Sequence, residues 1–222
     1  MIDVSDVSFS YDGVHELRFP TFSCRNGGKL LLLGNSGTGK TTLLHLMCGL
    51  LRPTKGSIIV SGKDLGGMSD RELDNFRGRE LGIVFQQSYF VQSLTVEENL
   101  ALPNLLSKKP ISSKDLKKRT LELLDRLGVG HKSKSRPKDL SVGEQQRASI
   151  ARALVHYPSV VFADEPSSAL DDTSTESVIK LLEEETANAG ATLIIVTHDS
   201  RLKARYSDRV ELTTTSSSLN HV

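Results

Sequence analysis

Eight residues in the first quarter of the chain have the types and the spacing of a loop that binds nucleotide phosphates. Residues 34–41 read Gly-Asn-Ser-Gly-Thr-Gly-Lys-Thr and fit the pattern G-x-x-x-x-G-K-[ST]. The glycines leave room for backbone N–H groups to surround the phosphates, and the helix expected to follow adds its positive N-terminus. In this pattern the Lys40 ammonium reaches the β- and γ-phosphates, and the Thr41 hydroxyl ligates Mg²⁺. The residues expected at the nucleotide are Gly34, Asn35, Ser36, Gly37, Thr38, Gly39, Lys40, Thr41 and Thr42.

Two carboxylates follow the apolar run Val160–Ala163. Asp164 is the expected partner of Mg²⁺, directly or through water, and Glu165 is placed to orient and deprotonate an attacking water. Alone, such a pair before Pro166 would more often be a surface turn. With a phosphate loop in the same chain, we interpret the pair as catalytic.

Two more polar residues come at the ends of expected strands. His198 follows the apolar run Leu193–Val196, and we expect it to contact the γ-phosphate and hold the attacking water. Gln86 ends the run that starts at Leu81, where it can touch both Mg²⁺ and that water. Either residue alone would be structural or merely exposed, so both interpretations depend on the neighbouring motifs.

The elements that must position these residues alternate between short apolar runs and helical patterns. This alternation predicts an α/β fold, a phosphate-loop NTPase core in which helices cover a mostly parallel sheet. The first 20 residues instead predict an antiparallel β subdomain, because the turn Tyr11–Gly13 separates two alternating runs. A helix is expected to follow the phosphate loop and to end near Gly49. Core strands are expected at 30–33, 57–61, 81–86, 160–164, 191–197 and 210–212.

The stretch from about 87 to 157 has a helical pattern, which predicts a helical subdomain inserted between two strands of the core. We expect a single domain over residues 1–212. Residues 213–222 are rich in Ser and Thr and predict a flexible tail.

The composition of the 222-residue chain narrows the class of protein. Its 37% hydrophobic and 25% charged residues exclude a wholly disordered chain, and 28 basic against 27 acidic residues give no net field that would attract nucleic acid. Cys24 and Cys48 stand far apart, which argues against a disulfide scaffold or a zinc module and favours the cytoplasm. No run reaches the roughly 18 apolar residues of a membrane span, and no signal peptide is recognisable, so another subunit must supply any membrane part.

Taken together, these motifs resemble an ABC-type ATPase subunit. The stretch Leu140–Glu144 reads LSVGE and is similar to the LSGGQ signature of that family, and Ser168–Asp171 resembles its D-loop. Tyr11 lies where the family places an aromatic residue that stacks on adenine. The motifs follow one another in the order of the family and span nearly the whole chain.

The resemblance implies a head-to-tail homodimer that encloses two ATP molecules. Each phosphate loop would face the signature of the other copy, where Ser141, the backbone of Gly143 and the helix starting near Glu144 would bind the γ-phosphate. Hydrolysis would let the dimer open, and the helical subdomain with the Gln86 loop would pass this motion to integral membrane permease subunits. The implied location is peripheral, on the cytoplasmic face of the inner membrane, with no nucleic acid as partner.

One position departs from the family pattern. Val142 replaces the first glycine of the signature, and valine is stiff and disfavours positive φ. If the loop needs that conformation, closure of the dimer is weakened. We expect activity to persist, because Ser141 and Gly143 remain.

A second layer of similarity points to one bacterial subgroup. The segments 68–77, 81–86 and 94–103, with Glu144 in place of the usual Gln, resemble the lipoprotein-releasing, macrolide-export and cell-division ATPases. This favours an exporter or extruder. The alternatives are a regulatory ATPase that moves a membrane complex without cargo and an importer ATPase. A soluble ATPase of DNA repair fits less well, because the sequence between Lys40 and Asp164 is too short for an inserted coiled coil.

Overall fold

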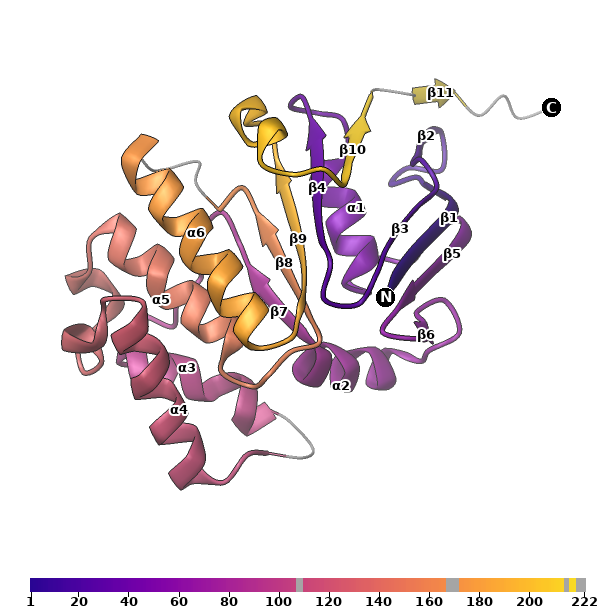
Figure 1. Cartoon of the computed structure of the whole chain (residues 1–222). Coiled ribbons are helices and arrows are strands. Elements are labelled where there is room, and N and C mark those ends of the chain that lie inside the picture. The colour runs from indigo at the N-terminus through magenta and orange to yellow at the C-terminus, as the bar shows by residue number, and fades with distance from the viewer. Residues whose placement is uncertain (107–109, 167–171, 214–215, 219–222) are drawn as a thin grey trace. The chain divides into compact units, whose positions relative to one another are not determined.

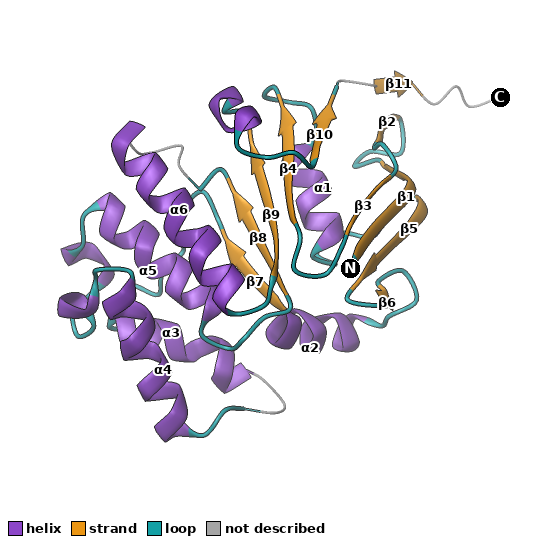
Figure 2. Cartoon of the chain, viewed as in Figure 1, coloured by secondary structure: helices purple, strands orange, loops and turns teal. Residues whose placement is uncertain are grey.

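The computed structural model describes residues 1–106, 110–166, 172–213 and 216–218, which divide into two compact units (Figures 1 and 2). The first unit combines Met1–Asp74 with the chain from Thr192 onward, and the second is Asn75–Ala191. The second unit is therefore larger than the helical insertion expected at 87–157. It also contains two strands and a long helix.

An antiparallel sheet forms one layer of the first unit. Its strands are ordered β11-β2-β1-β5-β6, and β3 also pairs with β1. The predicted hairpin is present, since Ser8 pairs with Arg18 and Phe9 with Leu17 across β1 and β2. Residues 216–218, which lie within the expected flexible tail, form β11 and pair with β2. The strands are β1 (Ile2–Phe9), β2 (His15–Arg18), β3 (Phe22–Cys24), β5 (Lys55–Val60), β6 (Lys63–Asp64) and β11 (Ser216–Ser218).

Parallel strands form the other layer of the first unit, in the order β10-β4-β9. These strands are β4 (Lys29–Gly34), β9 (Thr192–Thr197) and β10 (Arg209–Leu212). Helix α1 (Lys40–Met47) follows β4, and the short 3₁₀ helix η3 (Ser200–Ala204) follows β9. All residues of β9 are buried, as expected for a parallel strand covered on both faces. Helix α1 packs against β4, β5 and β9, and the positive φ of 64° at Gly49 ends it where the sequence predicted.

In the second unit, helices pack beside two parallel strands (Figure 2). Helix α5 contacts β7 and also packs against α3, α4 and α6. Strand β7 contains Gly82 because a Cβ there would lie 2.3 Å from the carbonyl oxygen of Ala153 in α5. The elements are β7 (Leu81–Val84), β8 (Val160–Asp164), α3 (Val96–Leu106), α4 (Ser113–Arg126), α5 (Val142–Leu154), α6 (Asp172–Asn188), η1 (Gly130–Lys132) and η2 (Pro137–Asp139), and α2 (Asp70–Glu80) leads into the unit.

No helix within the described ranges is long and apolar enough to cross a membrane.

A buried ion pair joins α4 to α6 in the second unit. Arg126 Nη2 lies 2.7 Å from Glu185 Oε1, and Glu185 is only 3% exposed. Burial raises the pKa of Glu185, although the charges of Arg126 and then Arg119 oppose the shift. Arg126, whose own side chain is half exposed, is therefore the main cation that favours the ionised carboxylate.

The Arg126→Met substitution should lower the free energy of unfolding by about 1–2 kcal/mol at neutral pH, because it leaves a buried carboxylate with only Arg119 to oppose the cost of its burial. Since the pKa of Glu185 is raised in the folded state, protonation favours folding, and the loss should shrink as the pH falls to about 5. Urea unfolding followed by circular dichroism at the two pH values measures both effects.

Lys180→Met is the matched control. Lys180 pairs with Glu184 at 3.8 Å on the exposed surface of the same helix α6, so its loss should cost less than about 0.5 kcal/mol. A loss for Arg126→Met that is equal at both pH values would contradict the role given to the Glu185 carboxylate.

Candidate functional site

The phosphate loop lies between β4 and α1 and has the backbone that the motif requires. Gly37 and Gly39 have φ values of 82° and 87°, in the left-handed region that favours glycine. The Lys40 ammonium folds back on the loop, donating to the carbonyl oxygens of Gly34 at 2.8 Å and Asn35 at 3.0 Å. The loop is thus already curved around the position of the lysine that is expected to meet the phosphates.

Close packing also requires glycine at two positions of this loop. A Cβ at Gly34 would lie 2.5 Å from Thr38 Oγ1 and 3.0 Å from the carbonyl oxygen of Leu212. A Cβ at Gly39 would lie 3.1 Å from Cε1 of Phe19, which follows β2. The loop is therefore closely packed at two positions, against β10 at Gly34 and against the Phe19 ring at Gly39.

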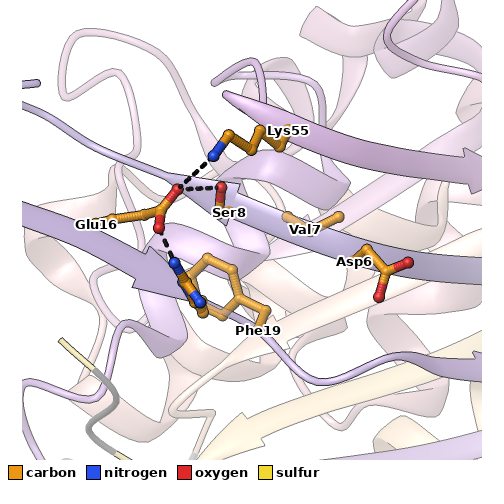
Figure 3. A pocket seen from close by; sticks show the side chains of 7 residues that line it. Asp6, Val7, Ser8, Glu16, Phe19 and Lys55 are labelled. Atoms are coloured by element: carbon orange, nitrogen blue, oxygen red, sulfur yellow. Dashed lines mark hydrogen bonds and ion pairs between the residues drawn. The ribbon is translucent and has the colours of Figure 1, made fainter. Parts of the chain in front are cut away.

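A cluster of charges in the antiparallel sheet supports the segment that carries Phe19 (Figure 3). Ser8 Oγ and Arg18 Nε each donate to the Glu16 carboxylate at 2.8 Å, and Lys55 Nζ lies 3.7 Å from it. These hydrogen bonds lower the pKa of Glu16, and the bond from Ser8 has the largest effect. The cavity beside them, of about 340 Å³, is also lined by Phe19. Because Arg18 and Lys55 are already paired with Glu16, we assign this cavity a structural role.

Tyr11 and His198 lie near the phosphate loop in the first unit. The Tyr11 ring is 68% exposed, meets Phe9 edge-on at 4.7 Å, and its hydroxyl lies 3.0 Å from Thr42 Oγ1. His198 follows Thr197, which pairs with Leu33 across the parallel strands β9 and β4. His198 is exposed, and its backbone lies at the sheet edge where β4 enters the phosphate loop.

The second unit brings Gln86, Asp164 and Glu165 to one sheet edge. Val84 pairs with Ala163 across the parallel strands β7 and β8, so the residues that follow both strands emerge together. Asp164 is buried, with 7% of its surface exposed. Glu165 has a φ of 46°, a left-handed conformation that is energetically unfavourable for any residue with a Cβ. The strained residue is the one expected to act as the base.

The signature stretch forms the start of helix α5. Ser141 is the N-cap, and its hydroxyl accepts from the Glu144 N–H at 3.2 Å while the Glu144 carboxylate accepts from the Ser141 N–H at 2.7 Å. This capping box accounts for the N–H groups of Ser141 and Glu144. The N–H groups of Val142 and Gly143 are the first-turn donors that it leaves for an anion.

Val142 does not have the left-handed conformation that valine disfavours. This residue is the first of α5 and has no positive φ, because the stretch is a helix start rather than a left-handed loop. Its side chain is 59% exposed, so the branched Cβ meets no obstacle.

Sequence reasoning missed the side chains that hold the segment after Gln86. Arg152 Nη1 donates to the Tyr89 carbonyl at 2.9 Å, and its guanidinium lies 4.7 Å from the centre of the Phe90 ring. Burial lowers the pKa of Arg152 to about 10. Asn99 closes the segment from α3, exchanging hydrogen bonds with the backbone of Val91. Such contacts between side chains and backbone have no fixed spacing that a sequence would reveal.

The expected D-loop, residues 168–171, lies outside the described residues.

Residues 17–168, more than half of the chain, match the family model described as ABC transporter. The chain belongs to the ABC transporter family. The match includes the phosphate loop, Gln86, the signature stretch and the Asp164–Glu165 pair, and it confirms the resemblance drawn from these motifs.

This ABC cassette is similar over its whole length to two dimeric structures of the ATP-binding cassette MJ0796, described as a bacterial ABC transporter cassette. One, a post-hydrolysis state bound to ADP and Pi, is 28% identical with a TM-score of 0.84, and the other is 29% identical with a TM-score of 0.85; both matches cover 100% of each chain. The cbiO1 protein of Clostridium perfringens is 30% identical with a TM-score of 0.79, over 89% of this chain and 78% of that one. The predicted α/β fold and the ATPase activity of the cassette are thereby confirmed.

Val142→Gly should leave the ATPase rate of the cassette within about threefold of the unmodified protein. The substitution removes an exposed side chain at a helix start, where glycine costs at most about 1 kcal/mol. Steady-state ATP hydrolysis measures the effect, and a gain above tenfold would mean that valine impairs the natural site.

Proposed function

We propose that this cassette binds ATP with Mg²⁺ between two copies of the chain and uses its hydrolysis to drive an integral membrane complex. The observation that carries the proposal is the pair of complementary anion sites on one chain. The first unit supplies the phosphate loop, and the second supplies the capped start of α5 with two first-turn N–H donors.

In the proposed site, the Lys40 ammonium exchanges the carbonyl oxygens of its own loop for the β- and γ-phosphates. The loop backbone from Gly34 to Thr42 surrounds the phosphates, with Ser36 and Thr38 among its N–H donors. The exposed Tyr11 ring, already placed beside Thr42, stacks on the adenine.

The residues proposed for Mg²⁺ fit the chemistry of that ion. Thr41, Gln86 and Asp164 offer hydroxyl, amide and carboxylate oxygens, which are the ligand types that Mg²⁺ prefers. Within the part of the chain that the structure describes, no three His, Cys, Asp or Glu side chains form a ready-made metal site. Mg²⁺ bound to phosphates needs only one or two protein ligands, and when bound it would neutralise charge on the phosphates.

For hydrolysis, we assign Glu165 the role of orienting and deprotonating the attacking water. The left-handed backbone at Glu165 ends the extended conformation of β8 directly after Asp164. His198 and Gln86 are proposed to hold the water and the γ-phosphate in line.

The dimeric MJ0796 structures, one of them bound to ADP and Pi, support a homodimer, and we place ATP at its interface. In the proposed dimer, Ser141, Gly143 and Glu144 of the second copy complete each site at the γ-phosphate. Loss of that phosphate removes the charge that bridges the two copies, and the dimer opens.

The cbiO1 structure is described as part of the ABC transporter complex cbiONQ, which supports integral membrane permease subunits as the further partners. We propose a peripheral position on the cytoplasmic face of the membrane and, from the segments around Gln86 and Asn99, an exporter or extruder of the lipoprotein-releasing and macrolide-export type. A regulatory ATPase without cargo and an importer ATPase use the same nucleotide chemistry. A soluble DNA-repair ATPase is the weakest candidate.

Glu165→Gln should reduce ATP turnover at least about 10²-fold, because an amide cannot take the proton of the attacking water. The substitution should preserve ATP binding and ATP-driven dimerisation, since it leaves the phosphate loop and the signature intact. Single-turnover hydrolysis measures the loss of turnover, and light scattering with ATP measures the preserved dimerisation, which itself requires ATP binding. Turnover near that of the unmodified protein would remove Glu165 from the role of base.

Affinity purification of the tagged chain from native membranes in mild detergent should recover a membrane protein with four transmembrane helices and a large domain on the far side. The Lys40→Ala variant, purified in parallel, tests whether capture depends on nucleotide. A many-helix permease with a solute-binding protein would favour the importer, and the absence of any membrane protein would reject the membrane role.

A further inference from the structure

Glu144 places a carboxylate at the start of the signature helix. Its Oε2 accepts from the Ser141 N–H at 2.7 Å, so the carboxylate lies within one turn of the N–H groups of Val142 and Gly143. If these groups bind the γ-phosphate, as the proposed function requires, a negative side chain lies beside a negative ligand. An uncompensated carboxylate within one helical turn of the γ-phosphate would weaken ATP binding.

A histidine and a lysine of η1 meet this carboxylate on its other oxygen. His131 Nε2 lies 3.3 Å and Lys132 Nζ 3.8 Å from Glu144 Oε1. Lys132 also donates to the carbonyl oxygen of Asp139 at 3.1 Å, which ties η1 to the residue just before the signature stretch. The hydrogen bond from Ser141 and the charge of Lys132 both lower the pKa of Glu144.

The placement of these two side chains is built into the backbone. Only Leu127, Gly128 and Val129 separate the end of α4 from the start of η1 at Gly130, and a Cβ at Gly130 would lie 1.7 Å from Asp125 Oδ1. Glycine therefore lets η1 turn tightly against the end of α4. The Lys132 side chain is only 26% exposed and that of Glu144 16%, so their attraction is partly shielded from solvent.

We propose that His131 and Lys132 are positioning residues for ATP: the Lys132 ammonium balances the charge of Glu144 and the His131 imidazole holds the carboxylate by a hydrogen bond, so that Glu144 can cap the signature helix without repelling the γ-phosphate bound by a second copy. This inference rests on the proposed function. It assigns the pair a role in ATP affinity and dimerisation rather than in the chemical step.

Lys132→Met tests the inference in the full chain. We expect the ATP concentration for half-maximal hydrolysis to rise about three- to tenfold with little change in kcat, because the unpaired Glu144 charge opposes ATP binding in the ground state and the transition state alike. In the Glu165→Gln background, ATP-driven dimerisation measured by light scattering should shift to higher ATP by the same factor. Added salt should reduce the shift, since it screens the charge. His131→Gln should have a smaller effect in the same direction.

Glu144→Gln provides the decisive comparison. An amide oxygen still accepts the Ser141 N–H, but no charge remains to be neutralised, so Lys132→Met should have almost no effect on the ATP requirement in this background. Lys138→Met is the matched control: Lys138 is an exposed lysine of η2, between Lys132 and Ser141 in sequence, with no ion pair to Glu144 among the described residues. Its substitution should change the ATP requirement by less than about twofold.

Two results would overturn the inference alone: an unchanged ATP requirement in Lys132→Met, or an equal shift with Glu144 and with Gln at position 144. Thermal unfolding of each variant identifies any that fail to fold, and His131→Gln then provides the same comparison. If the unmodified protein neither hydrolyses ATP nor dimerises with it, the proposed function is rejected and the inference with it.

Discussion

Binding of a phosphate group by backbone N–H groups is the constraint on which the rest of this structure depends. Such groups can meet a ligand only where no side chain intervenes and where the backbone is held in a conformation that most residues avoid. Gly37 and Gly39 provide the left-handed turns, and Gly34 provides the space against β10. The buried strands β4 and β9 anchor the loop at one end, and the eight residues of α1 anchor it at the other.

The support for this loop extends into the antiparallel sheet. Phe19 reaches Gly39 from the end of β2, and the adjacent Glu16 links β1, β2 and β5 through Ser8, Arg18 and Lys55. In the second unit, the polar ends of β7 and β8 and the capped start of α5 are held in the same manner, by strand register and by side chains that satisfy backbone groups. Precise backbone positions thus come from many modest interactions rather than from one strong one.

The sequence allowed prediction of those elements whose signal is local or strongly apolar. Strand β8 begins and ends where its apolar run predicts, and the hairpin of β1 and β2 has the expected turn. Helix α2 was missed because it is very polar and buries only Leu73 and Phe76, which give too weak a period. Strands β3, β6 and β11 have two or three residues each, too few for any alternation to appear. The sites of Arg152, Asn99, His131 and Lys132 depend on contacts across the second unit, which spacing along the chain does not encode.

Helix α5 has 13 residues, a rod about 20 Å long. Ser141 caps one end, and near the other end Arg152 donates a hydrogen bond to the carbonyl oxygen of Tyr89, three residues after Gln86. The Ala153 carbonyl approaches Gly82 so closely that any side chain at position 82 would push this end of the helix away from β7. One continuous helix therefore connects the signature to the backbone that follows Gln86, and the absence of a side chain at Gly82 sets how closely its far end lies on the sheet.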